Sequence, residues 1–193
     1  MQVNACFGGA MDKTRQKIID ATMNLIMEKG YASMTTKDIA QEAHVNESTL
    51  FRKFKNKKEI VLTAIEENWH PHLDQKDFLP ITKDFQKDLS HFATVYMQKL
   101  TPQFVKISIG LRTPELFLET RDTIMKVPQN FKEFLSDYFD MMNCHDSGTL
   151  AMMFLSMMFG FVFLKASFEN KLTDIQSDEY IQKSIEVFIK GIC

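Results

Sequence analysis

Glycine, proline and cysteine are scarce in this chain of 193 residues. Seven glycines and five prolines are about half the usual share of roughly 12%, which argues against collagen-like, low-complexity and turn-rich all-β proteins. The three cysteines, Cys6, Cys144 and Cys193, are widely spaced and form no CxxC pair, so neither a disulfide framework nor a zinc site is expected. We therefore expect a protein of the reducing cytoplasm that carries no metal and no cofactor.

Catalytic groupings are also lacking. Cys144, His145 and Asp146 are adjacent, but a catalytic triad is assembled in space and not from consecutive residues. No other acid–base or metal-binding pattern stands out, so the chain is not expected to be an enzyme. The first ten residues have neither the basic start nor the apolar stretch of a secretory signal. We also hypothesise that Met11 is the native first residue and that residues 1–10 are a leader. The mass of the native protein tests this hypothesis.

Charge and aromatic residues are present but unevenly distributed. The net charge is only −2, yet the run 51–58 (FRKFKNKK) holds five positive and no negative residues. The chain has 17 Phe and 13 Met against four Tyr and one Trp. Fourteen of these Phe and eight of these Met follow residue 69. The composition indicates a mostly helical protein with a Phe- and Met-rich interior and one local basic segment.

One uncharged segment is long enough to require a membrane test. The eighteen residues between Asp146 and Lys165 carry no charge. A segment of this length is at the lower limit for a transmembrane helix. Serine, threonine and glycine interrupt the segment, and no second one follows. Since a helix that is apolar all round can also be buried in protein, we expect a buried or dimer-forming helix and no membrane partner, with a membrane span as the alternative.

Apolar spacing and capping residues predict an all-α chain of about nine helices, without strand alternation. A hydroxyl residue before proline marks a helix start at Thr101-Pro102 and at Thr113-Pro114. The other expected helices span 12–29 with Gly30 as the stop, 36–43, 47–54, 57 to the residue before Pro71, 81–100, one begun or kinked at Pro128 that ends near 143, 147–168 and 177–190.

Two of these helices, 36–43 and 47–54, are joined by a three-residue turn and match a helix-turn-helix, whose second helix lies in the major groove of DNA. Short polar residues form the first turn of the second helix, and cations lie near its end and just after it. The polar residues suit base edges and phosphates, and the cations suit phosphates. Thr36 at a helix N-terminus suits a phosphate oxygen. The alternative is a helical interaction protein whose basic run binds an acidic partner or a membrane surface.

Residues 15–62 resemble the N-terminal DNA-binding domain of the TetR family of bacterial transcriptional regulators. The segments that carry the resemblance are Arg15, Ile18, Ile19, Ala21 and Leu25, Gly30-Tyr31, TTKDIAQEA (35–43), VNESTLFRKF (45–54) and NKKEI (56–60). The resemblance implies a helix-turn-helix DNA-binding domain of three or four helices over 11–57. It also implies a helical effector-binding and dimerisation domain over 58–193.

The resemblance also implies DNA contacts. By position these are Thr36, Asn46, Glu47, Ser48, Thr49, Phe51, Arg52, Lys53 and Lys57. Three residues depart from the family pattern: Phe51 stands where tyrosine is usual, Ser48 where glycine is common, and His44 where a turn glycine is usual. A non-glycine residue in that turn is expected to adopt a positive φ, which His tolerates better than most residues. Glu47 is either a reader of cytosine N4 or a mildly repulsive neighbour of the DNA.

For the C-terminal domain the resemblance implies a ligand cavity with adaptable thioether and aromatic walls. The candidate wall residues are Phe92, Tyr96, Phe104, Ile107, Leu111, Phe117, Phe134 and Tyr138, with His91, Gln98 and Arg112 as polar groups that orient a ligand. The alternative is that these side chains only fill the core.

The last two helices resemble the dimerisation helices of the family. The implied mechanism is a homodimeric repressor on double-stranded DNA with a palindromic operator, released by a small apolar or amphipathic effector.

Overall fold

The computed structural model describes residues 12–69, 71–168 and 171–192, and all regular secondary structure in these ranges is helical. The predicted all-α class is thus confirmed. The chain forms two compact units, Met1–Trp69 and His70–Cys193. The hypothesis of a native start at Met11 concerns residues that lie outside the described ranges.

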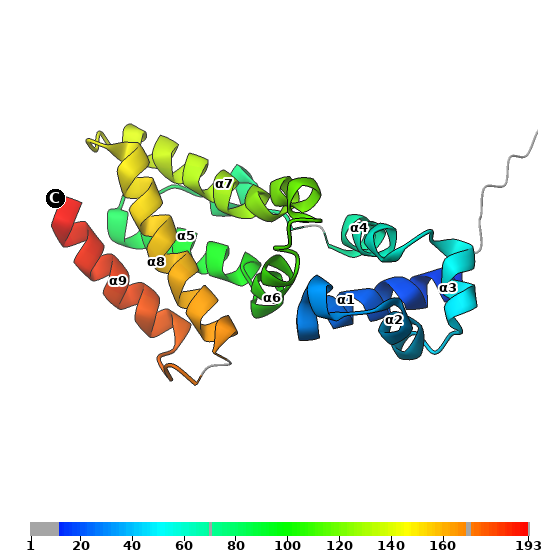
Figure 1. Ribbon diagram of the computed structural model, residues 1–193. Helices are drawn as coiled ribbons and strands as arrows, with labels where there is room; N and C mark the ends of the chain where they lie inside the picture. Colours follow the sequence, from blue (N-terminus) through cyan, green and yellow to red (C-terminus); the bar gives the residue numbers. More distant parts are fainter. Residues whose placement is uncertain (1–11, 70, 169–170, 193) are drawn as a thin grey trace, which may run out of the picture. The chain divides into compact units, whose positions relative to one another are not determined.

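The described part of the N-terminal unit consists of four helices (Figure 1): α1 (Lys13–Ser33), α2 (Thr36–Glu42), α3 (Glu47–Lys53) and α4 (Lys57–Asn68). Helix α1 packs along α4 and against α2, which in turn packs on α3. Ile18, Ile39 and Leu50 are fully buried between them. The sequence predicted a domain boundary after residue 57. In the structure α4 completes the core around α1 and belongs to the N-terminal unit.

Local chemistry explains where these helices start and turn. The Asp12 carboxylate accepts hydrogen bonds from the Thr14 and Arg15 amides at the start of α1. The helix is interrupted at Gly30, whose φ of 72° favours glycine, and a last turn follows to Ser33. Thr35 and Asp38 form a reciprocal capping box at the start of α2. His44 has a φ of 53° in the turn between α2 and α3, which confirms the positive φ expected there.

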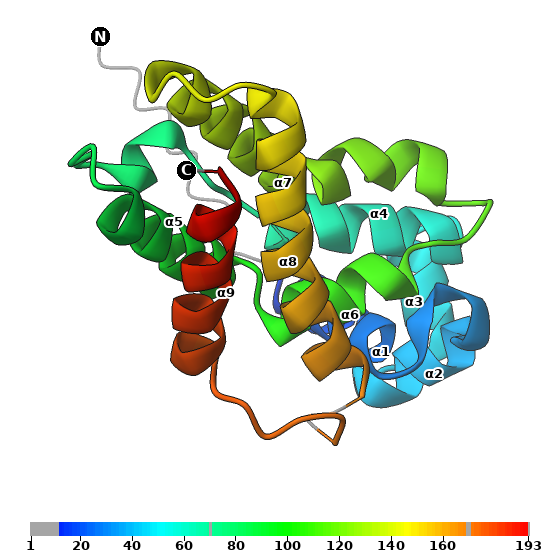
Figure 2. The same ribbon diagram turned by 90° about the vertical axis from the view of Figure 1, so that its left-hand side faces the viewer.

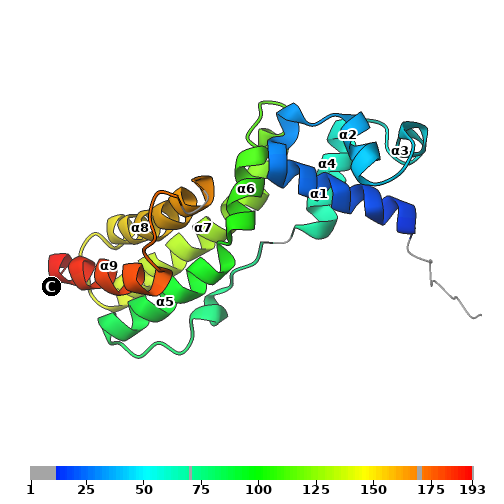
Figure 3. The same ribbon diagram turned by 90° about the horizontal axis from the view of Figure 1, so that it is seen from below.

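The C-terminal unit contains the short 3-10 helix η1 (Gln75–Phe78) and five α-helices. These are α5 (Phe85–Lys99), α6 (Pro102–Gly110), α7 (Phe117–Met141), α8 (Ser147–Ser167) and α9 (Ser177–Ile192). Helix α8 packs against α7 and α6 (Figure 2). Helix α9 packs against α5 (Figure 3). Thr101 caps α6 with Pro102 in its first turn, as predicted.

Helix α7 takes the place of the two helices predicted here, one starting at Thr113-Pro114 and one begun or kinked at Pro128. Thr113 opens a turn that leads into the helix, in which its carbonyl accepts a hydrogen bond from the Phe117 amide at 2.9 Å. Pro128 lies inside the single helix of 25 residues. Proline removes one backbone donor, but apolar residues on both sides of it, such as Ile124 and Phe131, are buried. Packing of this face keeps the helix continuous.

An aromatic cluster fills the centre of the C-terminal unit. Phe78 stacks on Phe134 with ring centroids 4.2 Å apart, and Tyr96 stacks on Phe131 at 4.1 Å. Phe92 meets Phe134 edge-on at 4.8 Å. These rings come from η1, α5 and α7, so burial of their large apolar area joins segments that are distant in sequence.

A buried carboxylate fastens the loop before α5. Asp88 is 1% exposed. One of its oxygens accepts hydrogen bonds from the Thr82 amide at 2.8 Å and the Thr82 hydroxyl at 2.7 Å. The other accepts from the Lys83 amide at 2.8 Å and the Tyr138 hydroxyl at 3.1 Å. Burial, together with the negative charge of Asp88, raises the pKa of Tyr138 well above its usual value. Asp88 therefore links the loop, α5 and α7 through four hydrogen bonds.

Candidate nucleic-acid interface and ligand cavity

Helix α3 presents a polar surface on an apolar anchor. Leu50 points into the core and is fully buried, which fixes the rotation of this short helix. Asn46, Ser48 and Arg52 are exposed on it, and Phe51 is 49% exposed. Asn46 occupies the N-cap position, but its side chain makes no capping hydrogen bond. Its amide therefore remains available for contacts outside the helix.

The predicted phosphate contact Thr36 and the predicted groove residue Glu47 are bonded to each other. The Thr36 hydroxyl donates a hydrogen bond to the Glu47 carboxylate at 2.6 Å, from the first turn of α2 to the first turn of α3. The bond places a negative charge beside the hydroxyl that was expected to bind a phosphate oxygen. A phosphate that binds there has to displace Glu47 from Thr36.

Four of the five cations of the 51–58 run fall into two groups. The Lys53 ammonium forms an ion pair with Asp12, and this hydrogen bond lowers the pKa of Asp12. The Lys57 ammonium donates to the carbonyls of Tyr31 at 3.0 Å and Met34 at 3.1 Å, and lies 3.9 Å from the centre of the Tyr31 ring. Both side chains were expected on DNA, but the structure uses them to hold α3 and α4 to α1.

Arg52 and Lys55 form the second group. Both are exposed, and within the described part of the chain neither charged group forms a hydrogen bond or an ion pair. Cations of this kind can neutralise phosphates without first breaking an internal bond. The sequence alone shows the number of cations in the run but does not separate these two from the internally bonded ones.

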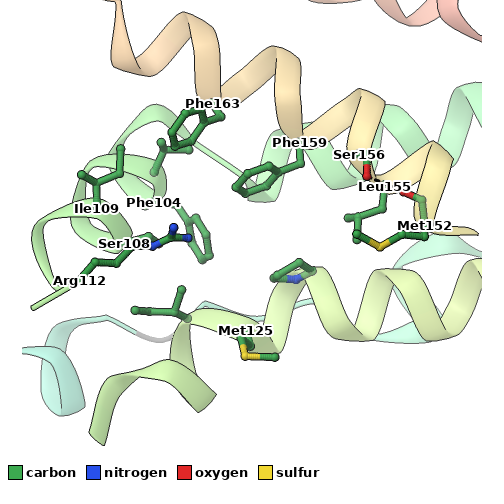
Figure 4. A pocket seen from close by; sticks show the side chains of 13 residues that line it. Phe104, Ser108, Ile109, Arg112, Met125, Met152, Leu155, Ser156, Phe159 and Phe163 are labelled. Atoms are coloured by element: carbon green, nitrogen blue, oxygen red, sulfur yellow. Dashed lines mark hydrogen bonds between the residues drawn. The ribbon is translucent and has the colours of Figure 1, made fainter. Parts of the chain in front are cut away.

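The C-terminal unit holds a cavity of about 230 Å³ between α6, α7 and α8 (Figure 4). Its walls are mainly phenylalanine, methionine and aliphatic side chains. The lining residues are Phe104, Val105, Ser108, Ile109, Arg112, Ile124, Met125, Pro128, Met152, Leu155, Ser156, Phe159 and Phe163. Within the described residues, no group of three His, Cys, Asp or Glu side chains could hold a metal ion. Because most of the lining side chains are apolar, the cavity is suited to a largely apolar molecule.

The predicted wall residues lie mostly outside this cavity. Phe104 lines it, as does Arg112 among the polar candidates. The rings of Phe92 and Tyr96 are fully buried in the aromatic cluster, Ile107 and Leu111 are fully buried in the core, and Phe117 is 42% exposed. Phe134 and Tyr138 border a second hollow of about 380 Å³ beside Leu79 and Ile81. His91 and Gln98 line neither. Most of these side chains therefore fill the core, which was the alternative to a ligand-binding role.

Helix α8 contributes side chains to the cavity that were not predicted from the sequence. Met152, Ser156, Phe159 and Phe163 line the cavity from this helix but were not proposed. Their spacing of three to four residues was the available signal, since it places them on one face. The uniformly apolar character of the segment hid that face.

Comparisons with known proteins agree with this architecture. The family model described as "Bacterial regulatory proteins, tetR family" matches residues 18–64. The chain is similar to the HTH-type transcriptional regulator YvkB of Bacillus subtilis (strain 168), with 31% identity over 193 residues, 94% of this chain and 98% of that protein. It is 23% identical to the biofilm operon icaADBC HTH-type negative transcriptional regulator IcaR of Staphylococcus epidermidis, over 91% of this chain and 99% of that protein.

Solved structures show the same fold. The transcriptional regulator FadR from Bacillus subtilis, in complex with stearoyl-CoA, superposes with a TM-score of 0.63 at 19% identity, over 92% of this chain and 99% of that chain. NalD, the secondary repressor of the MexAB-OprM multidrug efflux pump in Pseudomonas aeruginosa, gives a TM-score of 0.64 at 18% identity, over 95% and 98%. With its helix-turn-helix and a relative of 31% identity matched over nearly the full length of both proteins, the chain belongs to the tetR family of bacterial regulatory proteins.

Proposed function

We propose that the protein is a homodimeric repressor of the cytoplasm that reads a palindromic operator and is released by a small effector in its C-terminal unit. The observation that carries the proposal is the exposure of α3. Its anchor Leu50 is buried, whereas Asn46, Ser48 and Arg52 face outward. Such a helix can enter the major groove with its polar N-terminal residues at base edges.

The proposed contacts divide into readers and phosphate binders. Asn46, Ser48 and Thr49 are short polar residues in the first turn of α3 and are assigned to base edges. Arg52 and Lys55 are assigned to phosphates, because their charged groups form no hydrogen bond or ion pair with another described residue. Phe51 is assigned to apolar contact with thymine methyl groups or sugars, which its exposed ring allows.

The role of Glu47 follows from its bond to Thr36. Since its carboxylate accepts from the Thr36 hydroxyl at 2.6 Å, we assign it to repulsion of phosphates and not to the reading of cytosine. In this role Glu47 weakens binding to all DNA sequences to a similar extent, so a regulator that carries it depends more strongly on correct base contacts.

Selection of bound DNA from a random pool tests the proposal. The wild-type protein is expected to enrich a palindrome whose half-sites are centred about 34–36 Å apart, one turn of the double helix. The Glu47→Gln variant is expected to enrich the same palindrome and to bind both specific and random DNA roughly 10-fold more tightly, because one negative charge per protomer is removed. An exposed site in the other unit, Gln103→Ala, is the control and should change neither result.

Two outcomes would contradict these assignments separately. Binding without any sequence preference would contradict the operator proposal and favour the alternative of a basic run that binds acidic surfaces. Loss of preference at a single G·C position in the Glu47→Gln variant would show instead that Glu47 reads cytosine.

The dimer proposal rests on apolar surface that α8 and α9 leave uncovered. Met153 is 53% exposed, Leu164 42% and Val187 61%. By length and composition alone α8 is able to cross a membrane, and only 28% of an 18-residue apolar stretch of it is buried within the chain. Isologous packing of two copies covers the same patch on both subunits and gives the assembly two copies of α3.

Light scattering of the purified protein is expected to give twice the chain mass of 22.4 kDa. Leu164→Glu is expected to produce the single-chain mass, because a charge placed in an apolar interface is left unpaired. Leu118→Glu is the matched control: Leu118 is an apolar residue on α7 that is 71% exposed, and its replacement should leave the dimer intact. A wild-type monomer in solution, or recovery of the protein with membranes, would contradict the proposed role of α8.

A further inference from the structure

We propose that the cavity between α6, α7 and α8 binds an amphipathic molecule with one negatively charged head, which Arg112 and Ser108 hold at one end of the cavity. The inference rests on the proposed effector function and specifies the chemical class of the effector. In Figure 4, Arg112 reaches toward the end of the cavity where Phe104 and Ser108 lie, and Met152 and Ser156 lie at the opposite end.

The first observation is a buried hydroxyl without a partner. Ser108 is 5% exposed and lines the cavity. Its Oγ has no hydrogen-bond partner within the described residues. Buried polar groups in folded proteins are nearly always paired, because an unpaired one loses its bonds to water without replacement. An acceptor atom of a ligand in the cavity would satisfy this hydroxyl.

The second observation is the charge balance of the lining. Among the described residues that line the cavity, Arg112 is the single charged one, and no Asp or Glu accompanies it. Its guanidinium makes no hydrogen bond or ion pair with another described residue. The third polar residue of the lining, Ser156, already donates its hydroxyl to the Met152 carbonyl at 2.7 Å. The unused polar groups are therefore donors at one end, which favour an anionic acceptor over a neutral or cationic head.

The rest of the lining determines the body of the ligand. Met152 and Phe163 are eleven positions apart on α8, about 16 Å along the helix at 1.5 Å per residue. Between them Leu155 and Phe159 continue the apolar wall, and Met125 faces it from α7. Such a wall suits an extended apolar body, and its flexible thioethers adapt to the body's shape.

Two fluorescent probes that differ only in charge test the inference on the full chain without DNA. 8-Anilinonaphthalene-1-sulfonate carries a sulfonate, and N-phenyl-1-naphthylamine has the same rings without it. Arg112→Gln is expected to weaken sulfonate binding about 10-fold, a typical effect of losing a charge-assisted pair, and to leave the neutral probe within twofold. Ser108→Ala should weaken the sulfonate probe about threefold. Arg112→Lys should retain most of its binding.

Two controls locate the effect. Arg121→Gln removes the same charge from an exposed site on α7 that lies outside the cavity, and it should change neither probe. Phe159→Ala shortens the wall and should weaken both probes. Equal behaviour of the two probes in Arg112→Gln would overturn the inference, and so would probe binding that Phe159→Ala leaves unchanged.

Release of operator DNA is measured in a separate titration of the protein–DNA complex. If the anionic probe binds as expected but the operator stays bound, the repressor mechanism fails and the anion site stands. If a neutral amphiphile releases the operator and Arg112→Gln has no effect on any probe, the mechanism stands and the anion site fails.

Discussion

Replacement of both Arg52 and Lys55 by glutamine is expected to lower operator affinity about 10³-fold at physiological salt. In the proposed homodimer the double variant removes four phosphate contacts, two from each protomer. Each contact adds about 0.9 to the slope of log affinity against log salt concentration, because bound counterions are released from the DNA. The slope is therefore expected to become shallower by about 3.6. Fluorescence anisotropy with labelled operator at several salt concentrations measures both quantities.

These two cations are chosen because, in residues 12–69, their charged groups form no hydrogen bond or ion pair. Both are exposed, whereas Lys53 pairs with Asp12 and Lys57 bonds to the carbonyls of Tyr31 and Met34. A double variant at Lys53 and Lys57 would change stability and DNA binding together. The variant at Arg52 and Lys55 should unfold at the same urea concentration as the wild type, so a change in affinity reports on DNA alone.

The matched control for this experiment is Lys106→Gln with Lys132→Gln. Both lysines are exposed in the C-terminal unit, so the control changes the net charge equally at sites with no proposed DNA contact. If the control lowered affinity as much as the test variant, the loss would reflect overall charge. An unchanged salt slope in the test variant would show that these side chains do not contact phosphates.

Replacement of Asp88 by alanine is expected to lower the free energy of unfolding by about 3–5 kcal/mol. Asp88 is 1% exposed and accepts four hydrogen bonds, two from Thr82, one from Lys83 and one from Tyr138. Alanine removes the acceptor and leaves these donors without their partner, which costs more than the net value of the bonds. Urea unfolding followed by tyrosine and tryptophan fluorescence measures the change.

Two companion variants separate the carboxylate from its partners. Tyr138→Phe removes one of the four bonds and is expected to cost about 1.5 kcal/mol. Asp84→Ala removes the nearby N-cap of α5, which accepts from the Lys87 amide at 3.1 Å, and is expected to cost about 1 kcal/mol. If Asp88→Ala cost no more than Asp84→Ala, the carboxylate would be an ordinary helix-end group and not the link between loop, α5 and α7.

The features that were predicted correctly depend on short stretches of sequence. The Thr101-Pro102 start of α6 and the positive φ of His44 are set by a few adjacent residues. Capping and turn chemistry act over three or four positions. The local sequence left open whether Pro128 begins or kinks a helix. Burial of Ile124 and Phe131 keeps α7 continuous there, because packing against other helices can override a local preference.

The functional residues show the same division. The sequence identified α3 and its polar first turn, but it did not distinguish the cations with internal partners from Arg52 and Lys55, since Asp12 and Tyr31 are distant in the chain. Nor did it separate core aromatics such as Phe92 from cavity residues such as Phe159. All of these apolar residues have the helical spacing that burial requires, and that spacing does not depend on what covers them.

The sequence by itself determined the helical class, the helix-turn-helix and the excess of Phe and Met in the C-terminal unit, because periodicity, caps and composition are local properties. Only the tertiary structure decided which charges remain available for DNA, that Glu47 bonds to Thr36, and that Ser108 and Arg112 share a cavity with α8. Each of these depends on which residues, distant in the chain, packing brings together, and packing between helices is a property of the whole fold.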